Sequence, residues 1–372
     1  MSIQYKESGL LDLSLNDGTY CSPTCLDILH ACQDETALRH YSFENNEPLL
    51  NALATSNQLQ PHNIFLAAGS GPILKLGITH LIKQGIQNSY LNVVKYLCGL
   101  TAYPLLTPYL TYFKVPRKAL NNHIAVKLLK MTLDENYKLD IEHLTSLLKK
   151  QNALVYIANP NNPTGNLIID KEAIALLLTQ FPDSMFWIDE AYIEYVSDYA
   201  NSSVASWVNN YNNLCVSRSF SFAYGLASIH AGYLMANQNL ITALNAATTE
   251  YRIGRLLEKI VLAAIKDQQH LQNLRKFNAQ QISYLQENIE KHDFINIYPS
   301  IANFMLCEFK NHITAEAIYH ELLKHQIKIK KFDSLLDHDY QKFFRITVGL
   351  QEENEFFIKK FDEALGKLIE KT

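Results

Sequence analysis

The stretch LVYIANPNNPTG, residues 154–165, joins an unbroken apolar run to a turn rich in asparagine and proline. A short apolar run that ends in turn residues is typical of a strand buried on both faces of a sheet. Proline fixes its own φ and asparagine bonds to its own backbone, so residues 159–165 predict a rigid turn after that strand. Taken alone, this turn fits a structural role and a ligand-binding role equally well.

Strand and helix patterns alternate on either side of this turn. Apolar runs at residues 128–131 and 185–188 predict further buried strands, and residues 141–148 and 173–178 carry apolar side chains at helical spacing. Such alternation predicts an α/β fold, with a mainly parallel sheet covered by helices on both faces. The carboxyl ends of its strands then gather at one edge, where ligands bind.

The final third of the chain has a different pattern. From about residue 265 the predicted helices lengthen, short strands are expected at residues 304–308 and 344–348, and residues 357–368 form an apolar helical stripe. We therefore expect a smaller α+β domain after the large one. The predicted parts are an N-terminal arm, a large domain and a small C-terminal domain, at residues 1–30, 31–264 and 265–372.

The composition excludes several classes of protein. Of the 372 residues, 48% are hydrophobic and 19% are charged, and the net charge of −4 gives no sign of a nucleic-acid partner or an anionic membrane surface. No apolar run approaches the roughly 20 residues that cross a bilayer. The six cysteines lack the paired spacing of a metal site. We expect a cytoplasmic protein with reduced cysteines and no metal.

Two more motifs stand where ligands bind in such a fold. Asp189 follows the apolar run at residues 185–188, and a carboxylate there is costly to bury unless a cation pairs with it. A helix N-cap is the alternative role. Gly69, Ser70 and Gly71 precede an apolar helical stretch, and free backbone N–H groups at a helix start attract phosphate. A plain turn fits this second motif as well.

In this order and spacing, the motifs resemble those of the class I/II aminotransferases of fold type I, most nearly the histidinol-phosphate aminotransferases. The resemblance extends from Asn16 to Asn354. It implies pyridoxal 5'-phosphate, or pyridoxamine 5'-phosphate, as the cofactor. It also implies that Asn162 and Tyr192 contact the hydroxyl of the cofactor ring and that Asp189 pairs with the ring nitrogen.

The resemblance further assigns residues to the cofactor phosphate. It places Gly69, Ser70 and Gly71 around that phosphate, and it includes Ser219, Ser221 and His230 among the cofactor-binding residues. Tyr41 matches a tyrosine that reaches the phosphate from the neighbouring subunit, which implies a homodimer. Among the tyrosines at positions 103, 109 and 112, we expect Tyr109 to stack on the ring.

Two basic residues are assigned to the substrate, an amino acid or an amino-phosphate compound. Arg345 matches the arginine that grips a carboxylate with two bonds, although a structural ion pair is the alternative. Lys330 falls where histidinol-phosphate aminotransferases carry another arginine. It keeps the positive charge but lacks the planar guanidinium that binds an anion with two bonds.

One motif departs from the family pattern. The family sequence around the Schiff-base lysine is loosely Thr-x-Ser-Lys-x-Phe-Gly-Leu-Ala-Gly-x-Arg-x-Gly-Tyr, and residues 219–233 here are SFSFAYGLASIHAGY. The flanking matches place Phe222 at the lysine and His230 at the phosphate-binding arginine. Phenylalanine can neither hold the cofactor covalently nor move a proton. His230 remains a candidate base near neutral pH.

Three hypotheses about function follow. In the first, the protein binds the cofactor non-covalently and carries out altered amino-acid chemistry, with Lys330 or Lys331 supplying an amine or with His230 acting as a base. In the second, it is a catalytically inactive homologue that acts as a binding or regulatory partner. In the third, the pocket takes a different carboxylate ligand, with Phe222 as an apolar wall.

Overall fold

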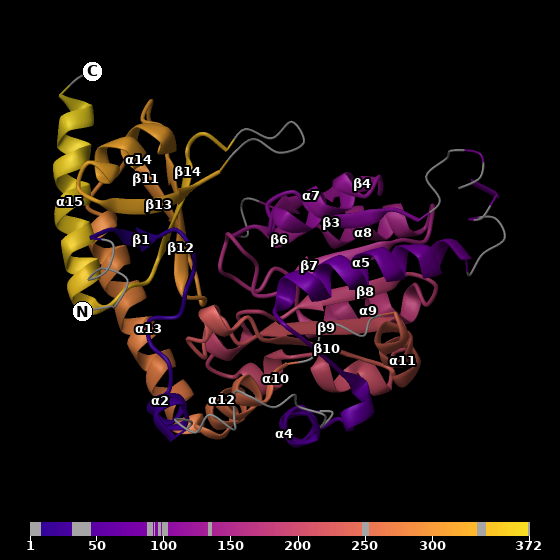
Figure 1. The fold of residues 1–372 in the computed structure, drawn as a ribbon. Helices are drawn as coiled ribbons and strands as arrows, with labels where there is room; N and C mark the ends of the chain where they lie inside the picture. Colours follow the sequence, from indigo (N-terminus) through magenta and orange to yellow (C-terminus); the bar gives the residue numbers. More distant parts are fainter. Residues whose placement is uncertain are drawn as a thin grey trace.

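The computed structural model describes residues 9–31, 46–87, 92, 94–95, 98, 103–132, 136–247, 253–332 and 340–370. A large sheet forms the centre of one domain, and a smaller sheet lies beside it in a second domain (Figure 1). In the described residues, the remaining two strands, β5 (Met131–Thr132) and β6 (Lys138–Leu139), form a two-stranded sheet. The predicted α/β fold with a smaller α+β domain is confirmed.

The large sheet has seven strands in the order β2-β10-β9-β8-β7-β3-β4. Strand β10 is antiparallel to both of its neighbours, and the pairs from β9 through β8, β7 and β3 to β4 are parallel. In sheet order the bounds are β2 (Ile64–Ala67), β10 (Gly232–Ala236), β9 (Leu214–Ser219), β8 (Met185–Asp189), β7 (Leu154–Ala158), β3 (Leu105–Pro108) and β4 (Val126–Leu129).

Both faces of the large sheet are buried, as its unbroken apolar strands predict. On β7, Leu154 and Tyr156 join one apolar cluster, and Val155 and Ile157 join another on the opposite face. The first cluster lies under α5 (Ser70–Gln87), α7 (Lys114–Asn121) and α11 (Gln238–Ala246). The second lies under α4 (Glu47–Ser56), α8 (Ile141–Leu148), α9 (Lys171–Gln180) and α12 (Arg255–Lys266). Burial on both faces explains why these strands lack polar alternation.

The short elements of the large domain are α10 (Tyr199–Ser202) and the 3₁₀ turns η1 (Pro61–Asn63), η3 (Ile193–Tyr195), η4 (Ala205–Asn209) and η5 (Ala227–Ile229). One predicted strand is wrong in its bounds. The strand expected at residues 128–131 is divided at Lys130, because the Lys130 backbone bonds to Asp140 and to the His143 ring instead of to a neighbouring strand.

The small sheet has five strands in the order β1-β13-β14-β12-β11. Its bounds are β1 (Leu11–Leu13), β13 (Ile327–Lys331), β14 (Phe343–Thr347), β12 (Phe304–Phe309) and β11 (Ile295–Tyr298). Strand β1 comes from the predicted N-terminal arm and pairs in parallel with β13. The sheet packs against α14 (Ala315–Leu323), α15 (Gln351–Ile369) and the long α13 (Gln268–Ile289), around a core of its own.

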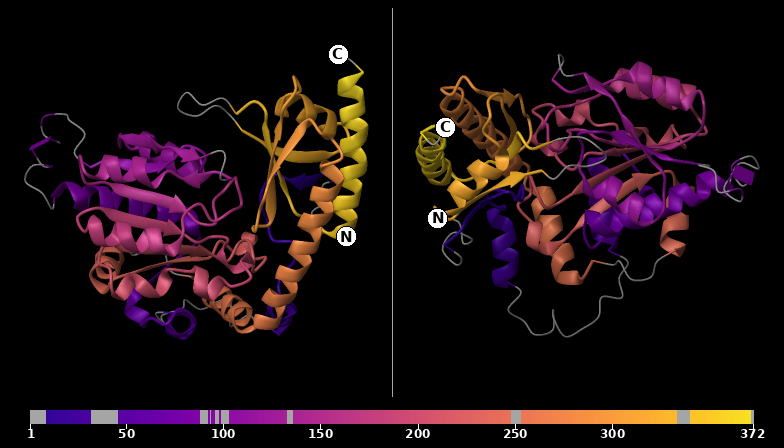
Figure 2. Two further views of the ribbon diagram at one scale, coloured as in Figure 1. Left: turned by 180° about the vertical axis from the view of Figure 1, so that it is seen from behind. Right: turned by 90° about the horizontal axis from the view of Figure 1, so that it is seen from above.

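Helix α13 connects the two domains. It begins where α12 ends and runs up the side of the small domain, next to α15 (Figure 2). The arm helix α2 (Pro23–Ala31) packs on α12. The predicted domain boundary after residue 264 falls near the end of α12, and its position remains a prediction. In the described residues, no helix is long and apolar enough to span a membrane.

Candidate active site

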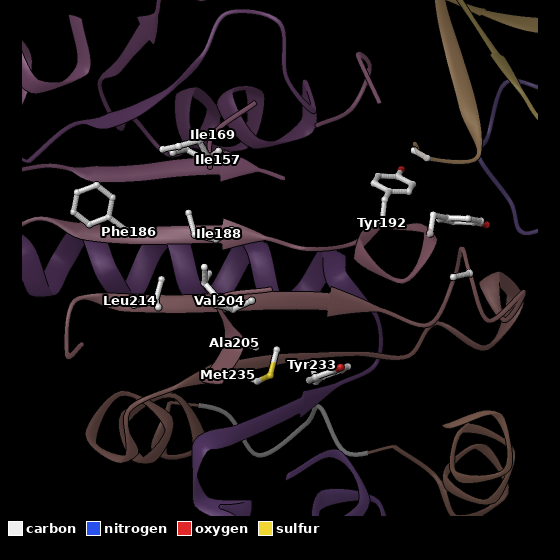
Figure 3. Packing of buried hydrophobic residues seen from close by; sticks show 14 of the residues in the cluster. Ile157, Ile169, Phe186, Ile188, Tyr192, Val204, Ala205, Leu214, Tyr233 and Met235 are labelled. Carbon is white, nitrogen blue, oxygen red and sulfur yellow. The ribbon is translucent and has the colours of Figure 1, made fainter. Parts of the chain in front are cut away.

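The carboxyl ends of β7, β8 and β9 lie at the edge of the large sheet that faces the small domain. Figure 3 shows Ile157 and Ile188 on neighbouring strands, with Tyr192 beyond the strand ends. The turn after β7 carries Asn162, and β8 ends at Asp189. The parallel sheet therefore brings the two motifs to one edge, as predicted.

Asp189 is only 6% exposed, and its carboxylate accepts hydrogen bonds from neutral groups. The hydroxyl of Tyr156 donates to Oδ2 at 2.5 Å, and the hydroxyl of Ser217 donates to Oδ1 at 2.8 Å. No ion pair to Asp189 occurs among the described residues. Burial therefore raises the pKa of this carboxyl, although its hydrogen bonds oppose the shift. A cation placed beside Asp189 would complete the site.

Arg345 is a buried cation that has no carboxylate partner among the described residues. It is 5% exposed, and burial lowers the pKa of its guanidinium to about 10. Its Nη1 donates to Oδ1 of Asn162 and its Nη2 donates to the Ser14 carbonyl, each at 2.7 Å. Its Nε has no hydrogen-bond partner in the part of the chain that the structure describes. Three of its five N–H groups thus remain available to an anion.

Tyr192 connects this arginine to the arm. Its phenolic oxygen accepts a 3.2 Å bond from Nδ2 of Asn162 and a 3.0 Å bond from Nδ2 of Asn16. Asn16 in turn bonds to Thr347, two residues beyond Arg345 on β14. The two amides fix the position of the Tyr192 oxygen and leave its own proton free to reach a ligand.

Phe222 lies in the loop after β9 and stacks on Tyr192. The two ring centroids are 4.3 Å apart, and the rings are inclined by 23°. The loop is held from the arm side, because a Cβ on Gly18 would lie 2.1 Å from the carbonyl oxygen of Phe222. An apolar ring therefore lies against Tyr192 at the end of this loop segment, and the match of Phe222 to the lysine of the family pattern remains a prediction.

Three of the predicted phosphate-binding residues, Gly69, Ser70 and Gly71, lie at the start of α5, and His230 lies next to Gly69. Gly69 has a φ of +100°, and a Cβ on it would lie 3.6 Å from the Cβ of His230. His230 is exposed. At the end of β9 the backbone N–H of Ser221 donates to Oγ of Ser219 at 3.2 Å.

A lysine that the sequence did not suggest lies beside this helix start. The Lys118 ammonium donates to the carbonyl of Gly71 at 2.9 Å, and burial and neighbouring lysines lower its pKa. The sequence pattern gives no sign of this lysine, because α7 and α5 are distant in the chain and meet only in the folded protein.

Arg345 opens into a cavity of about 340 Å³ between the arm and the two domains. Four lysines line it as well: Lys114, Lys328, Lys330 and Lys331. Lys328 pairs with Asp12 and Lys331 with Glu316, but none of the described residues that line the cavity is a carboxylate. Lys330 is beside Arg345 in the sheet register and lies 5.0 Å from the centre of the Phe113 ring. The charge of this cavity fits an anionic ligand.

The two tyrosines near the cavity, Tyr109 and Tyr112, lie in different pockets. Tyr109 lines a smaller neighbouring pocket, whereas Tyr112 lines the cavity together with Asn162, Tyr192 and Phe222. Burial raises the pKa of Tyr112 to about 12, and the charges of Asp189 and Arg345 act on it in opposite directions. Which of the two tyrosines faces a cofactor ring remains a prediction. Tyr41 lies outside the described residues.

Comparison with known proteins agrees with this geometry. A family model for aminotransferases of class I and II matches residues 92–361. The chain belongs to this family. The chain is 31% identical over 326 residues to a histidinol-phosphate aminotransferase of Thermoanaerobacter pseudethanolicus. The match covers 87% of this chain and 84% of that protein. It is 25% identical over 358 residues to histidinol-phosphate aminotransferase 2 of Legionella pneumophila, covering 95% and 90%.

Solved structures of such aminotransferases share the fold. The histidinol-phosphate aminotransferase of Clostridium acetobutylicum superposes with a TM-score of 0.82 at 23% identity, covering 96% of this chain and all of that one. The enzyme of Sinorhizobium meliloti, in complex with pyridoxal-5'-phosphate, gives 0.79 at 21% identity, covering 98% and 94%. The residues present fit such a cofactor, because the buried Asp189 carboxylate has no cationic partner within the described chain.

Proposed function

We propose that this aminotransferase-like protein binds pyridoxal or pyridoxamine phosphate non-covalently and acts on an amino compound that carries a carboxylate. Because Phe222 replaces the lysine, the reaction differs from ordinary transamination. The proposal rests on one observation: two buried charges of opposite sign, Asp189 and Arg345, each lack an ionic partner among the described residues.

A cofactor and substrate together would supply both missing partners. A protonated ring nitrogen pairs with Asp189, and a substrate carboxylate pairs with Arg345. Uncompensated buried charges are costly, so their persistence at one edge of the sheet supports a ligand with matching charges. The charges of both residues act on the pKa of Tyr112, which burial raises to about 12.

The chain's own residues then have distinct roles. Pyridoxal phosphate, when bound, supplies a ring that draws electrons from bonds at the substrate's α-carbon. Tyr192 and Asn162 orient the ring hydroxyl, and the start of α5 with Gly69–Gly71 holds the phosphate. Arg345 orients the substrate through its carboxylate. The apolar ring of Phe222 excludes water from its side of the cavity.

Proton transfer at the α-carbon needs a group other than Phe222. Lys330 lines the cavity, so its ammonium can hold or move a proton there. His230 is not among the residues that line this cavity, and it is exposed beside the phosphate-binding turn. Of the two predicted catalytic residues, Lys330 is therefore the better supported by its position. The lysine-rich wall also favours a substrate with a second anionic group, such as a phosphate.

A second candidate function follows from the Phe222–Tyr192 stack. The stack fills the position of an amine with an apolar contact of 4.3 Å, which suits a protein that binds a ligand without turnover. Such a catalytically inactive homologue would serve as a binding or regulatory partner. In either case we propose a cytoplasmic homodimer in which Tyr41 of one subunit reaches the cofactor phosphate of the other.

Cofactor uptake distinguishes these functions. The purified protein is mixed with each form of the cofactor, and absorption spectra and mass spectrometry after acid release measure what remains bound. Retained cofactor supports the proposal, and borohydride treatment with peptide mapping then shows whether any lysine is covalently linked. Refusal of both forms at millimolar concentration contradicts it. A co-purifying carboxylate without a pyridine ring would instead identify a recruited pocket.

A further inference from the structure

Two hydroxyl groups hold the Asp189 carboxylate from opposite sides. Tyr156 on β7 donates to one oxygen, and Ser217 on β9 donates to the other, at 2.5 and 2.8 Å. Tyr156 is fully buried and Ser217 is 2% exposed. Both bonds are charge-assisted, and bonds of this kind are shorter and stronger than those between neutral groups.

The register of the sheet makes this arrangement possible. Asp189 on β8 is paired with Ser217 on β9 and with Ala158 on β7, which places Tyr156 two residues back on the same face. Because successive side chains alternate between the faces, all three polar groups point to the side covered by α5. The carboxylate is thus bracketed by its two neighbouring strands.

A third residue fixes the direction of the Ser217 hydroxyl. The indole N–H of Trp187 donates to Oγ of Ser217 at 2.8 Å. Indole nitrogen can only donate, so the single proton of Ser217 is directed to Asp189. Each hydrogen bond in this series therefore has a fixed direction: Trp187 donates to Ser217, and Ser217 donates to Asp189.

These donors act on the charge of the carboxylate. Burial raises the pKa of Asp189, and the bonds from Tyr156, Ser217 and the Ala191 backbone lower it again. The titratable side chains that share these surroundings are Glu190, Tyr112, Tyr192 and Cys215. None of these four is a cation at neutral pH, and Arg345, the cation that acts on Tyr112 and Tyr192, forms no ion pair with Asp189 among the described residues. Within the described chain, hydrogen bonds are therefore the interactions that oppose the effect of burial on this carboxylate before a ligand arrives.

We propose that Tyr156 and Ser217 are positioning residues that keep Asp189 ionised and fixed for pairing with the cationic ring nitrogen of the cofactor. This inference rests on the proposed function and deepens it, since it says how the fold prepares the site for a protonated ring. Neither residue touches the ligand. Each acts through the carboxylate.

The test compares Tyr156→Phe and Ser217→Ala with two matched controls. Tyr195→Phe and Thr107→Val also remove buried hydroxyls, but these hydroxyls have no hydrogen-bond partner among the described residues. The measurements are the dissociation constant of pyridoxal phosphate and the pH midpoint of the bound chromophore's absorption. Loss of one bond to a charged group should weaken binding by about tenfold.

The pH midpoint separates positioning from general destabilisation. A less ionised Asp189 stabilises the ring proton less, so the chromophore of both variants should titrate at lower pH than in the wild type. The controls should keep the wild-type affinity and midpoint. If the variants also match the wild type in both measurements, the proposal is overturned.

Failure of the proposed function would give a different result. If the wild-type protein takes up no cofactor, ¹³C-aspartate NMR of the ligand-free protein still reports Asp189, assigned by its loss in Asp189→Asn. Tyr156→Phe and Ser217→Ala should raise the titration midpoint of that carboxyl, and the controls should not. An unchanged midpoint overturns the role of the two hydroxyls independently of cofactor binding.

Discussion

The side-chain amide of Asn16 donates a 3.0 Å hydrogen bond to the phenolic oxygen of Tyr192, a residue 176 positions later in the chain. Asn16 is 1% exposed and has a φ of +63°, which asparagine tolerates better than most residues. Its backbone carbonyl accepts a bond from Asn303. The arm, the large domain and the small domain therefore meet at this one side chain.

Substitutions of Asn16 should separate its backbone role from its side-chain role. Asn16→Gly keeps the left-handed conformation and loses the side-chain bonds, whereas Asn16→Ala loses both. We expect the alanine variant to be less stable than the glycine variant by about 1 kcal/mol. Urea unfolding at neutral pH measures the difference, and equal stabilities would show that the conformation at Asn16 carries no cost.

Replacing Phe222 with lysine should restore the missing amine. We expect Phe222→Lys, once loaded with pyridoxal phosphate and reduced with borohydride, to gain the mass of the cofactor on the peptide that contains residue 222. Phe222→Leu is the control and should gain nothing, because it changes the ring without adding an amine. Labelling elsewhere, or none at all, would mean that position 222 does not face the cofactor.

Arg345 should control the affinity for carboxylate substrates. Arg345→Lys keeps a positive charge but loses the planar set of N–H groups, so amino-acid binding to the cofactor-loaded protein should weaken by about tenfold or more. Arg255→Lys, at the exposed start of α12, is the matched control and should bind normally. Spectral titration measures both, and equal affinities would place the carboxylate elsewhere.

The buried Glu194 should make stability depend on pH. Its carboxyl is 1% exposed, and burial raises its pKa to about 7, although Arg218, whose Nη1 lies 3.9 Å from Oε1, opposes the shift. The unfolded chain has the ordinary value near 4.5, so ionisation costs stability as pH rises from about 4.5 to about 7.

Glu194→Gln removes that cost. We expect the variant to be more stable than the wild type by up to about 3 kcal/mol at pH 8, with the gain disappearing towards pH 4.5. Unfolding free energies measured across this pH range test the prediction. A gain that does not change with pH would assign the effect to packing.

Gly18 should be intolerant of any side chain. A Cβ there would lie 2.1 Å from the carbonyl oxygen of Phe222 and 2.7 Å from Cα of Gly225, both in the backbone. Gly18→Ala should therefore destabilise the protein by about 2 kcal/mol. Gly366→Ala is the control, since nothing lies within 4 Å in α15, and it should stabilise by about 1 kcal/mol. Thermal unfolding compares the two.

The fold was predictable because its strands are buried on both faces. The run at residues 154–158 and the run at 185–189 carry this burial in their composition alone, and each ends in the polar residues that the parallel sheet gathers. Asn162 and Asp189 could thus be placed at one edge without the structure.

Contacts between distant segments were not predictable. Asn16 gives no local sign of its bond to Tyr192, and Tyr156 looks like one more apolar strand residue until the register with β8 is known. The different surroundings of Tyr109 and Tyr112 were hidden for the same reason. Three residues apart in a turn, they face different pockets.

The parallel pairing of β1 with β13 sets an order of assembly. During synthesis the large domain can collect its strands as they emerge, but Leu11–Leu13 must wait for Ile327–Lys331 before they have a partner. Until then the first strand is an unpaired edge, and such edges invite contact with other chains. The nascent protein therefore carries an unpaired strand, prone to contact with other chains, until Ile327–Lys331 have been translated.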